Sequence, residues 1–405
     1  MINLLGIMCF SILGLLTFIS LYQWGHAILA ILFQRPPHVQ PMLRKTRFLV
    51  LIPAHNEEEG LPETLQSLVS LQYPAHLVQI VVIADRCEDA TAQMARNGGA
   101  ICLERSEGPG GKGAAMSWAL NELRKVEVEF DALVIVDADC LADTYLLGAF
   151  DDALTKGHAV QQGYNYLSNP WESPFTRLIA VTSVLRNFLF YGGKEAMGCS
   201  PMLSGTGMCL SRSVVDRYGW SAFSVSEVWE FSVSLMLNNV RLFFNPWARV
   251  FARESKGLKQ ASRQRLRWAT GRYAIIKSGA QKLLVKGISE KRIDLIDAAV
   301  TLSIPNYSSQ ASLTLLAIFG GLFARGDPTW SFLLPWSIGI LGSLGAYFFV
   351  GAMYTASPIK TLAGIPYIVV FLPWRLAIEV LGFLGFGRKG WGRTFRSSSA
   401  RRKTP

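Results

Sequence analysis

The sequence has few of the residues that build zinc sites and disulfide frameworks. Its six cysteines contain no C-x-x-C pair, and its five histidines do not cluster. Zinc-site spacing is therefore absent. Scattered cysteines of this kind are typical of reduced, structural thiols in a cytoplasmic domain.

Charged residues are also scarce: they make up 17% of the 405 residues, whereas 50% are hydrophobic. This balance is too apolar for an ordinary soluble enzyme. The apolar residues gather at the two ends of the chain, and the middle has the charge and turn content of a globular α/β domain that can bury its own core. The composition predicts a globular domain flanked by membrane segments.

Acidic residues are fewer than basic ones, 29 against 40, which gives a net charge of +11. In a membrane protein, such an excess usually marks the cytoplasmic side and contact with anionic lipids. Nucleic acid is the alternative partner of a basic chain, but no module that combines basic and aromatic residues is present. We therefore expect membrane lipids, and no nucleic acid, as partners.

The N-terminal apolar stretch, residues 2–33, is longer than the roughly 20 residues that span a bilayer. It has no preceding basic region, which argues against a cleaved signal peptide, and Arg35, Arg44 and Lys45 follow it. By the positive-inside rule, the N-terminus lies outside and the next domain in the cytoplasm. We expect residues 1–34 to form a transmembrane helix of a multi-pass protein of the cell (inner) membrane.

The C-terminal region contains candidate spans at 308–323 and 331–350, and a third apolar segment at 362–386. Charges in that third segment, Arg375 and Glu379, are costly inside a bilayer. If this segment crossed the membrane, the basic tail would also lie outside, against the positive-inside rule. We expect the segment to re-enter or to lie in the interface, with Arg375 paired to Glu379. The expected divisions are interfacial helices at 276–306, membrane segments at 307–387 and a cytoplasmic tail at 388–405.

The middle of the chain alternates strand and helix patterns. Strands are predicted at 48–53, 78–85, 100–103 and 133–140, and helices at 61–71, 90–97, 112–123 and 146–154. This order implies a mostly parallel sheet with right-handed crossovers. In such a sheet, ligands bind at the carboxyl ends of the strands, so we expect a nucleotide there.

Two carboxylates, Asp137 and Asp139, end the apolar run 133–136. This spacing suits a hard divalent cation such as Mg²⁺ or Mn²⁺ shared with a substrate diphosphate. The alternative is a solvated pair of aspartates in a turn. The glycines before Lys112 allow the backbone to approach a phosphate at a helix N-terminus, although a flexible loop explains them equally. They form neither a Walker A loop nor G-x-G-x-x-G.

Three later stretches add candidate site residues. Gly205, Thr206 and Gly207 indicate a tight loop that enters a strand and leaves room for a sugar. Glu227 and Glu230 share one helical face, for which a solvated helix is the alternative. Gln264, Arg267 and Trp268 also share a face, where Arg267 can bind diphosphate oxygens and Trp268 can stack on a sugar. A basic amphipathic helix on the membrane would give the same pattern.

Together these motifs resemble those of the membrane-bound family 2 glycosyltransferases, the group of the cellulose, hyaluronan and poly-N-acetylglucosamine synthases. The resemblance covers about 46–275, and the motifs occur in the family's order. It implies a GT-A fold, a cytoplasmic catalytic domain, a UDP-sugar donor and Mg²⁺ or Mn²⁺. The residues that carry it are Pro53-Ala54-His55-Asn56-Glu57, Ala84-Asp85, Gly111-Lys112-Gly113, Asp137-Ala138-Asp139, Gly205-Thr206-Gly207 and Gln264-x-x-Arg267-Trp268.

The resemblance also implies roles for individual residues. Ala54, Glu57 and Asp85 would hold the uridine, and Lys112 would reach the base or the diphosphate. Asp137 would contact nucleotide or metal, and Asp139 would bind the metal. The group formed by Gln264, Arg267 and Trp268 would hold diphosphate and acceptor.

One position departs from the family's pattern. The usual Thr-Glu-Asp reads Ser226-Glu227-Val228 here, so Val228 replaces the aspartate that serves as the general base. We expect Glu227 to take over, with Glu230 as the second choice. The replacement leaves open an inactive or partner-dependent protein.

Three functions fit these observations. The first is an inverting membrane enzyme that extends a β-linked polysaccharide with glucose or N-acetylglucosamine, and Gln-x-x-Arg-Trp favours it. The second is transfer of a single sugar to a lipid, because few membrane segments are available to build a channel. The third is a non-catalytic scaffold among the subunits of an export complex.

Overall fold

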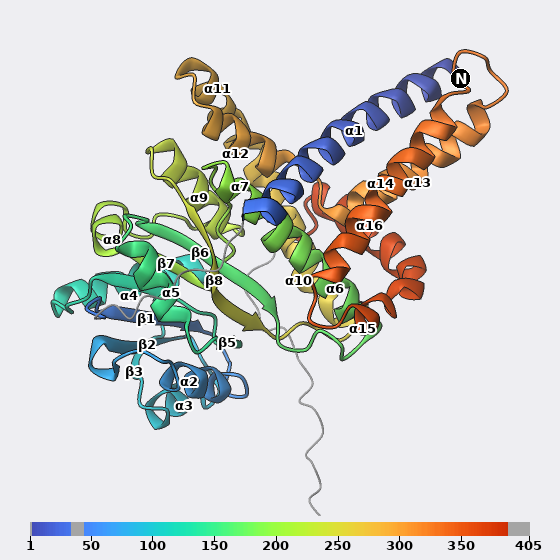
Figure 1. Cartoon of the computed structure of the whole chain (residues 1–405). Helices are drawn as coiled ribbons and strands as arrows, with labels where there is room; N and C mark the ends of the chain where they lie inside the picture. Colours follow the sequence, from blue (N-terminus) through green and yellow to red (C-terminus); the bar gives the residue numbers. More distant parts are fainter. Residues whose placement is uncertain (1, 34–43, 388–405) are drawn as a thin grey trace, which may run out of the picture.

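The computed structural model describes residues 2–33 and 44–387, and its α/β domain is built on one eight-stranded sheet (Figure 1). The strand order is β3-β2-β1-β4-β7-β6-β8-β5. The first four run parallel, and β7 runs antiparallel to β4 and β6. This confirms the mostly parallel sheet. The strands are β1 Phe48–Ala54, β2 Val78–Asp85, β3 Ile101–Arg105, β4 Ala132–Ile135, β5 Cys140–Ala142, β6 Val160–Leu167, β7 Met208–Ser211 and β8 Phe243–Ala252.

Alternate side chains of β1 enter two separate cores, one on each face of the sheet. Leu49 and Leu51 pack with helices α4, α8 and α9, whereas Phe48 and Val50 pack with α2, α3 and α5. The sheet is therefore buried on both faces, as its continuous apolar strands predict. These helices are α2 Leu61–Val69, α3 Thr91–Asn97, α4 Lys112–Lys125, α5 Leu146–Leu154, α8 Arg212–Tyr218 and α9 Glu227–Leu237.

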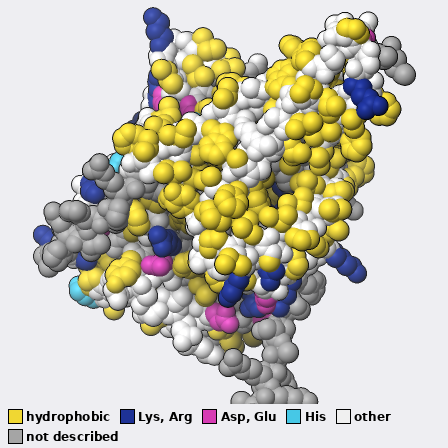
Figure 2. Space-filling view, turned by 45° about the vertical axis from the view of Figure 1, so that its right-hand side comes forward, with side chains coloured by type: hydrophobic (Ala, Val, Ile, Leu, Met, Phe, Trp, Pro, Cys, Tyr) yellow, Lys and Arg dark blue, Asp and Glu magenta, His cyan; other side chains and the backbone are white. Residues whose placement is uncertain are grey.

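Four helical segments are long and apolar enough to cross a membrane: Asn3–Phe33, Tyr307–Ala324, Leu333–Met353 and Pro358–Phe383. They correspond to α1 (Ile2–Phe33), α13 (Tyr307–Ala324), α14 (Leu333–Met353) and α15 with α16 (Pro358–Leu362 and Ile368–Phe383). In Figure 1, α1, α13 and α14 extend together away from the sheet. Hydrophobic side chains cover much of the face shown in Figure 2. Exposed examples on these helices include Phe18, Phe319 and Val369.

The last apolar segment contains the expected ion pair. Arg375 lies 2.9 Å from Glu379, and Glu379 also accepts hydrogen bonds from Asn306 and Tyr273. These bonds join α16 to the start of α13 and to α10 (Leu258–Ile275). Whether this segment spans or re-enters stays a prediction. The basic tail at 388–405, and Pro36, Pro37 and Pro41 in the linker, lie outside the described residues.

The N-terminal helix is attached to the α/β domain through a buried polar contact. Lys194, on α7 (Gly192–Ala196), contacts Asp297 of α12 (Ile293–Ser303), and Tyr22 of α1 donates a hydrogen bond to the same carboxylate. Beside it, a Cβ added at Gly193 would lie 2.0 Å from the carbonyl oxygen of His26. The glycine thus allows α7 and α1 to approach closely. The remaining helices are α6 Pro174–Val184, α11 Gln281–Ser289, the π-helices η2 Leu185–Tyr191 and η3 Ile276–Ala280, and the short 3₁₀-helices η1 Ala75–Leu77 and η4 Ile365–Tyr367.

Candidate active site

Asp137 and Asp139 lie just beyond the end of β4, which stops at Ile135. The predicted strand at 133–140 was therefore too long, since both aspartates belong to the turn between β4 and β5. The backbone N–H of Asp137 donates to Thr206 Oγ1 at 3.1 Å, and the N–H of Cys140 donates to the carbonyl of Asp137 at 3.1 Å. These bonds fix the turn beside the Gly205–Gly207 loop.

The ligand atoms of Asp137, Asp139 and Cys140 all lie within 4.8 Å of one another. Burial and the two adjacent carboxylates raise the pKa of the Cys140 thiol well above its usual range, so the thiol stays neutral. Thiolates are the form that binds metals. The two carboxylates are the oxygen ligands that Mg²⁺ and Mn²⁺ prefer. The aspartates therefore fit the expected cation, whereas a thiol is a poor ligand for Mg²⁺ or Mn²⁺.

Lys112 lies at the N-terminus of α4 and reaches into the same site. Its ammonium group contacts Asp137 and donates to the carbonyl oxygen of Gly205 at 2.6 Å. Burial lowers the pKa of Lys112, but the negative charges of Asp137 and Glu227 outweigh that effect, and the net shift is upward. The lysine is therefore a permanent cation between two carboxylates. Gly111, with φ of +122°, allows the backbone to enter the helix at this point.

Glu227 and Glu230 do not share one environment, although both lie in the first turn of α9. Glu227 lines the cavity beside Lys112, and burial raises its pKa despite the opposing charges of Lys112 and Arg267. Glu230 accepts a hydrogen bond from the N–H of Ser224 at 3.0 Å and is not one of the residues that line the cavity. Of the two glutamates, only Glu227 lines the cavity.

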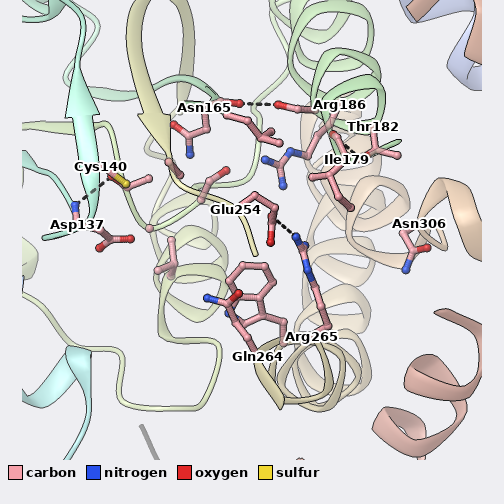
Figure 3. A pocket seen from close by; sticks show the side chains of 18 of the residues that line it. Asp137, Cys140, Asn165, Ile179, Thr182, Arg186, Glu254, Gln264, Arg265 and Asn306 are labelled. Carbon is pink, nitrogen blue, oxygen red and sulfur yellow. Dashed lines mark hydrogen bonds and ion pairs between the residues drawn. The ribbon is translucent and has the colours of Figure 1, made fainter. Parts of the chain in front are cut away.

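Helix α10 supplies the opposite wall of the cavity. Gln264, Arg267 and Trp268 all line it, and Trp268 is 43% exposed. The ring of Trp268 also packs under the guanidinium group of Arg265, whose carbon lies 4.7 Å from the ring centroid. Figure 3 shows Gln264 on this helix and Arg265 beside it, with the guanidinium group of Arg265 directed to Glu254.

The cavity has a volume of about 890 Å³ and extends from the two aspartates to the membrane helices. Its lining includes Tyr307 of α13, Tyr347 of α14, and Phe371 and Trp374 of α16. A space of this size accommodates a ligand larger than a single sugar. The site thus joins a polar, carboxylate-lined end to an end walled by membrane-helix side chains.

Most of the predicted site residues come together at this cavity. Its lining contains Glu57, Lys112, Asp137, Asp139, Gly205, Thr206, Glu227, Gln264, Arg267 and Trp268. The lining does not contain Ala54, Asp85, Gly207 or Glu230. Gly207 instead has a φ of +61° and enters β7, and a Cβ there would meet Val250 at 2.7 Å. The substrate contacts expected of Ala54, Asp85 and Gly207, and the catalytic role expected of Glu230, stay predictions.

Asp85 has a different set of partners from those that the resemblance implies. Its side chain is fully buried, and its carboxylate accepts hydrogen bonds from Arg105 at 2.6 Å and from Arg86 at 3.0 Å. A carboxylate with both oxygens bound by arginine is held in a fixed position behind the cavity lining. Arg86 in turn lies against the glycine loop, where a Cβ at Gly110 would meet its guanidinium at 2.6 Å.

Several cavity residues were missed by the sequence analysis. Arg186 lies on the π-helix η2, Glu254 follows β8 and forms an ion pair with Arg265, and Arg272 lies one turn beyond Trp268 on α10. The interruption of a helix by a π-turn often marks a functional site, but nothing in the residue pattern around Arg186 signals that turn. Only the fold brings these charges together.

A comparison with known families identifies the domain. Residues 46–271 match the family described as "Glycosyltransferase like family 2". The chain belongs to this family. The glycosyltransferase assignment and the GT-A-like fold are therefore confirmed, and the matched domain contains the acidic pair Asp137 and Asp139.

Curated relatives of this family 2 glycosyltransferase differ in their products. The chain is 30% identical to "Probable glycosyltransferase YdaM" of Bacillus subtilis over 58% of each chain. It is 26% identical to "Beta-monoglucosyldiacylglycerol synthase" of Trichormus variabilis, over 65% of this chain and 56% of the relative. It is 23% identical to "Poly-beta-1,6-N-acetyl-D-glucosamine synthase" of Staphylococcus aureus, over 56% and 54%. The chain thus spans little more than half the length of each relative.

A solved structure shares the arrangement of nearly the whole chain. This is "Mannosyltransferase PcManGT from Pyrobaculum calidifontis in complex with GDP-Man and Mn2+", with a TM-score of 0.55 and 17% identity. The match covers 95% of this chain and 98% of the other. At this identity, the likeness concerns the fold alone.

Proposed function

We propose that this enzyme transfers one hexose from a UDP-sugar to a hydroxyl group of a membrane lipid, with inversion at the anomeric carbon. The observation that carries the proposal is the cavity that runs from Asp137 and Asp139 to Phe371 and Trp374 of α16. A lipid acceptor held by its headgroup can enter such a cavity from the bilayer. The enzyme would be a multi-pass protein of the inner membrane, with its catalytic domain in the cytoplasm.

The extent of the cavity favours a lipid over a growing polymer. Helix α1 contributes only Gln23 to the lining, and α14 contributes only Tyr347. Helix α13 contributes its first two residues, Tyr307 and Ser308. Among the described residues, the outer parts of these helices do not line it. A polymer that leaves across the membrane needs a path along them. The similarity to a monoglucosyldiacylglycerol synthase supports the same conclusion.

The residues of the chain divide the reaction between them. Glu227 would accept the proton of the lipid hydroxyl as that oxygen attacks the anomeric carbon, and UDP would leave with the bonding electron pair. Lys112 and Arg267 would neutralise the diphosphate, and Trp268 would stack on the sugar. A Mg²⁺ or Mn²⁺ ion bound by Asp137 and Asp139 would stabilise the charge on the leaving group.

A polysaccharide is the second candidate product. It is favoured by Gln264, Arg267 and Trp268, the motif that the processive synthases share, and by the similarity to a poly-N-acetylglucosamine synthase. The two candidates differ in whether the first product re-enters the site as the next acceptor. Oligomer formation with partner chains would be needed to complete a channel.

Product analysis of the purified enzyme tests both candidates. UDP-glucose and UDP-N-acetylglucosamine are supplied in turn with Mn²⁺ and dioctanoylglycerol micelles, and released UDP is measured alongside mass spectrometry of the products. We expect UDP release and a single glycolipid. A ladder of oligomers would support the polymer instead. Absence of UDP release with every donor, with and without lipid, would fit the scaffold hypothesis.

A further inference from the structure

The two ends of the cavity carry charges of opposite sign. Carboxylates dominate around Asp137 and Asp139, where Glu57, Glu59 and Glu227 also line the wall. Toward the membrane helices, arginines outnumber carboxylates. The lining contains Arg186, Arg253, Arg265, Arg272 and Arg375, of which Arg253, Arg265 and Arg375 form ion pairs with Glu172, Glu254 and Glu379. A neutral sugar and diacylglycerol carry no negative charge that these arginines could bind.

Arg186 is the most available of these arginines. It is exposed toward the cavity and forms no ion pair among the described residues, and Figure 3 shows its guanidinium pointing to the centre. Its neighbour Asn187 is buried and donates to the carbonyl oxygens of Asn165 at 2.9 Å and Ser183 at 3.0 Å. These bonds hold the π-turn rigid, so the backbone of Arg186 is fixed before any ligand arrives.

Arg272 and Arg265 line the same cavity, and each has guanidinium N–H donors that are not used in hydrogen bonds among the described residues. Arg272 donates to the carbonyl oxygen of Ile304, and Arg265 pairs with Glu254. The Nε atoms of both arginines are buried without a hydrogen-bond partner in the described structure. Each guanidinium also has terminal N–H groups, and those not used in these bonds can donate to an oxyanion in the cavity.

Arg186 and Arg272 both line the cavity, and neither forms an ion pair among the described residues. Both act on one tyrosine: burial raises the pKa of Tyr191, and the positive charges of Arg186 and Arg272 oppose that rise. Arg267 instead lies in the field of Glu227 and Asp137. Arg267 therefore lies near the carboxylates of the donor site, whereas Arg186 and Arg272 lie near Tyr191.

We propose that Arg186 and Arg272 bind the phosphate of an anionic lipid headgroup, so that the acceptor is a phosphate-bearing lipid with a free hydroxyl. Guanidinium forks match phosphate oxygens in geometry and charge. The headgroup then lies between Arg186 and Trp268, with its hydroxyl toward Glu227 and its chains toward Phe371 and Trp374. The identity of the acceptor rests on the proposed function, but the anion site does not require turnover.

Native mass spectrometry of the detergent-solubilised full chain tests the site directly. The protein is mixed with equal amounts of dioctanoyl phosphatidylglycerol, dioctanoyl phosphatidylcholine and dioctanoylglycerol. We expect preferential binding of phosphatidylglycerol, and at least tenfold weaker binding of it in Arg186→Gln. Arg186→Lys, which keeps the charge but loses the fork, should be intermediate. Arg212→Gln, on α8, is the matched control, because Arg212 does not line the cavity, and it should bind as the unmodified protein does.

Other outcomes would overturn the proposal in recognisable ways. Equal binding of the three lipids, or unchanged binding in Arg186→Gln, removes the headgroup site while leaving glycolipid synthesis possible. A raised KM for the UDP-sugar in Arg186→Gln, with lipid binding unchanged, assigns the arginine to the donor instead. Competition by glycerol 3-phosphate as strong as that by the lipid means that the site binds free phosphate esters. Absence of any glycolipid, with selective binding retained, contradicts the proposed function alone.

Discussion

Lys112 contacts Asp137 directly, so a cation from the chain already occupies one side of the proposed metal site. Its ammonium group also donates to Gly205, which holds it in place. A bound Mn²⁺ would therefore share Asp137 with a positive neighbour. This arrangement weakens binding of the metal alone and leaves the full affinity to the metal together with the negatively charged donor.

Substitutions at the two positions should change Mn²⁺ affinity in opposite directions. Asp139→Asn removes a ligand and should weaken Mn²⁺ binding at least about tenfold. Lys112→Gln removes the competing charge, so Mn²⁺ alone should bind more tightly while the KM for the UDP-sugar rises. Titration of Mn²⁺ by electron paramagnetic resonance measures both affinities. Asp216→Asn, on the surface of α8, is the control, and weaker Mn²⁺ binding in Lys112→Gln would contradict this account.

The two glutamates of α9 should differ sharply in their effect on turnover. Loss of a general base costs about 10² to 10⁴ in rate, so Glu227→Gln should lower kcat at least about 100-fold with little change in the KM for the donor. Glu230→Gln keeps an oxygen that can accept from Ser224 and should change kcat less than about threefold. Initial rates of UDP release give both values. Full turnover by Glu227→Gln would exclude it as the base.

The buried ion pair that joins α7 to α12 should be sensitive to the loss of either partner alone. Lys194 is fully buried and contacts Asp297, so Lys194→Met or Asp297→Leu leaves one charge without its counter-ion. Breaking such a pair costs about 3–5 kcal/mol, whereas replacing both partners by apolar residues is far less damaging. We expect the double variant to have a higher Tm than either single variant in detergent. A double variant with the summed Tm loss would show that the pair is not coupled.

The sequence predicted those parts of the fold whose signals are local. β1, β2 and α5 follow from unbroken apolar runs or helical spacing, and they lie where expected. β6 was missed because its buried residues include Gln161 and Gln162. The side-chain amides of these glutamines donate to the carbonyl oxygens of Phe150 and Thr206 at 3.0 and 3.1 Å, so polar residues fill a core position. Such pairing depends on segments distant in the sequence, and so no local pattern reveals it.

For the site, too, the sequence predicted the residues with a local signal and missed those that distant segments bring together. Motifs whose residues lie close together in the sequence, such as Asp137-x-Asp139 and Gly205-Thr206-Gly207, were predicted from the spacing of those residues. Arg186 and Arg272 come from α/β-domain segments that only the fold brings to one cavity. The burial of Asp85 beneath Arg86 and Arg105 depends on the pairing of β2 with β3, which the sequence predicts in outline but not in register.

Glu195, on α7, should make the stability of the fold depend on pH. Its carboxylate accepts hydrogen bonds from Arg241 at 2.6 Å and from the N–H of Phe244 at 3.0 Å. Burial outweighs both of these interactions and raises the pKa of Glu195 from 4.5 to about 7. The folded state therefore binds this proton more tightly than the unfolded state. The resulting stability is complete below pH 4.5 and is lost as the pH rises through about 7.

Replacing this glutamate should flatten that dependence. Across the window the proton linkage amounts to at most about 3 kcal/mol, and Glu195→Gln removes it while keeping an acceptor for Arg241. We expect the Tm in detergent to fall between pH 5 and pH 8 more steeply for the unmodified protein than for Glu195→Gln. Glu122→Gln, on the surface of α4, should keep the steeper fall. Parallel Tm curves for the unmodified protein and Glu195→Gln would mean that Glu195 is ionised throughout, with the charge of Arg241 prevailing over burial.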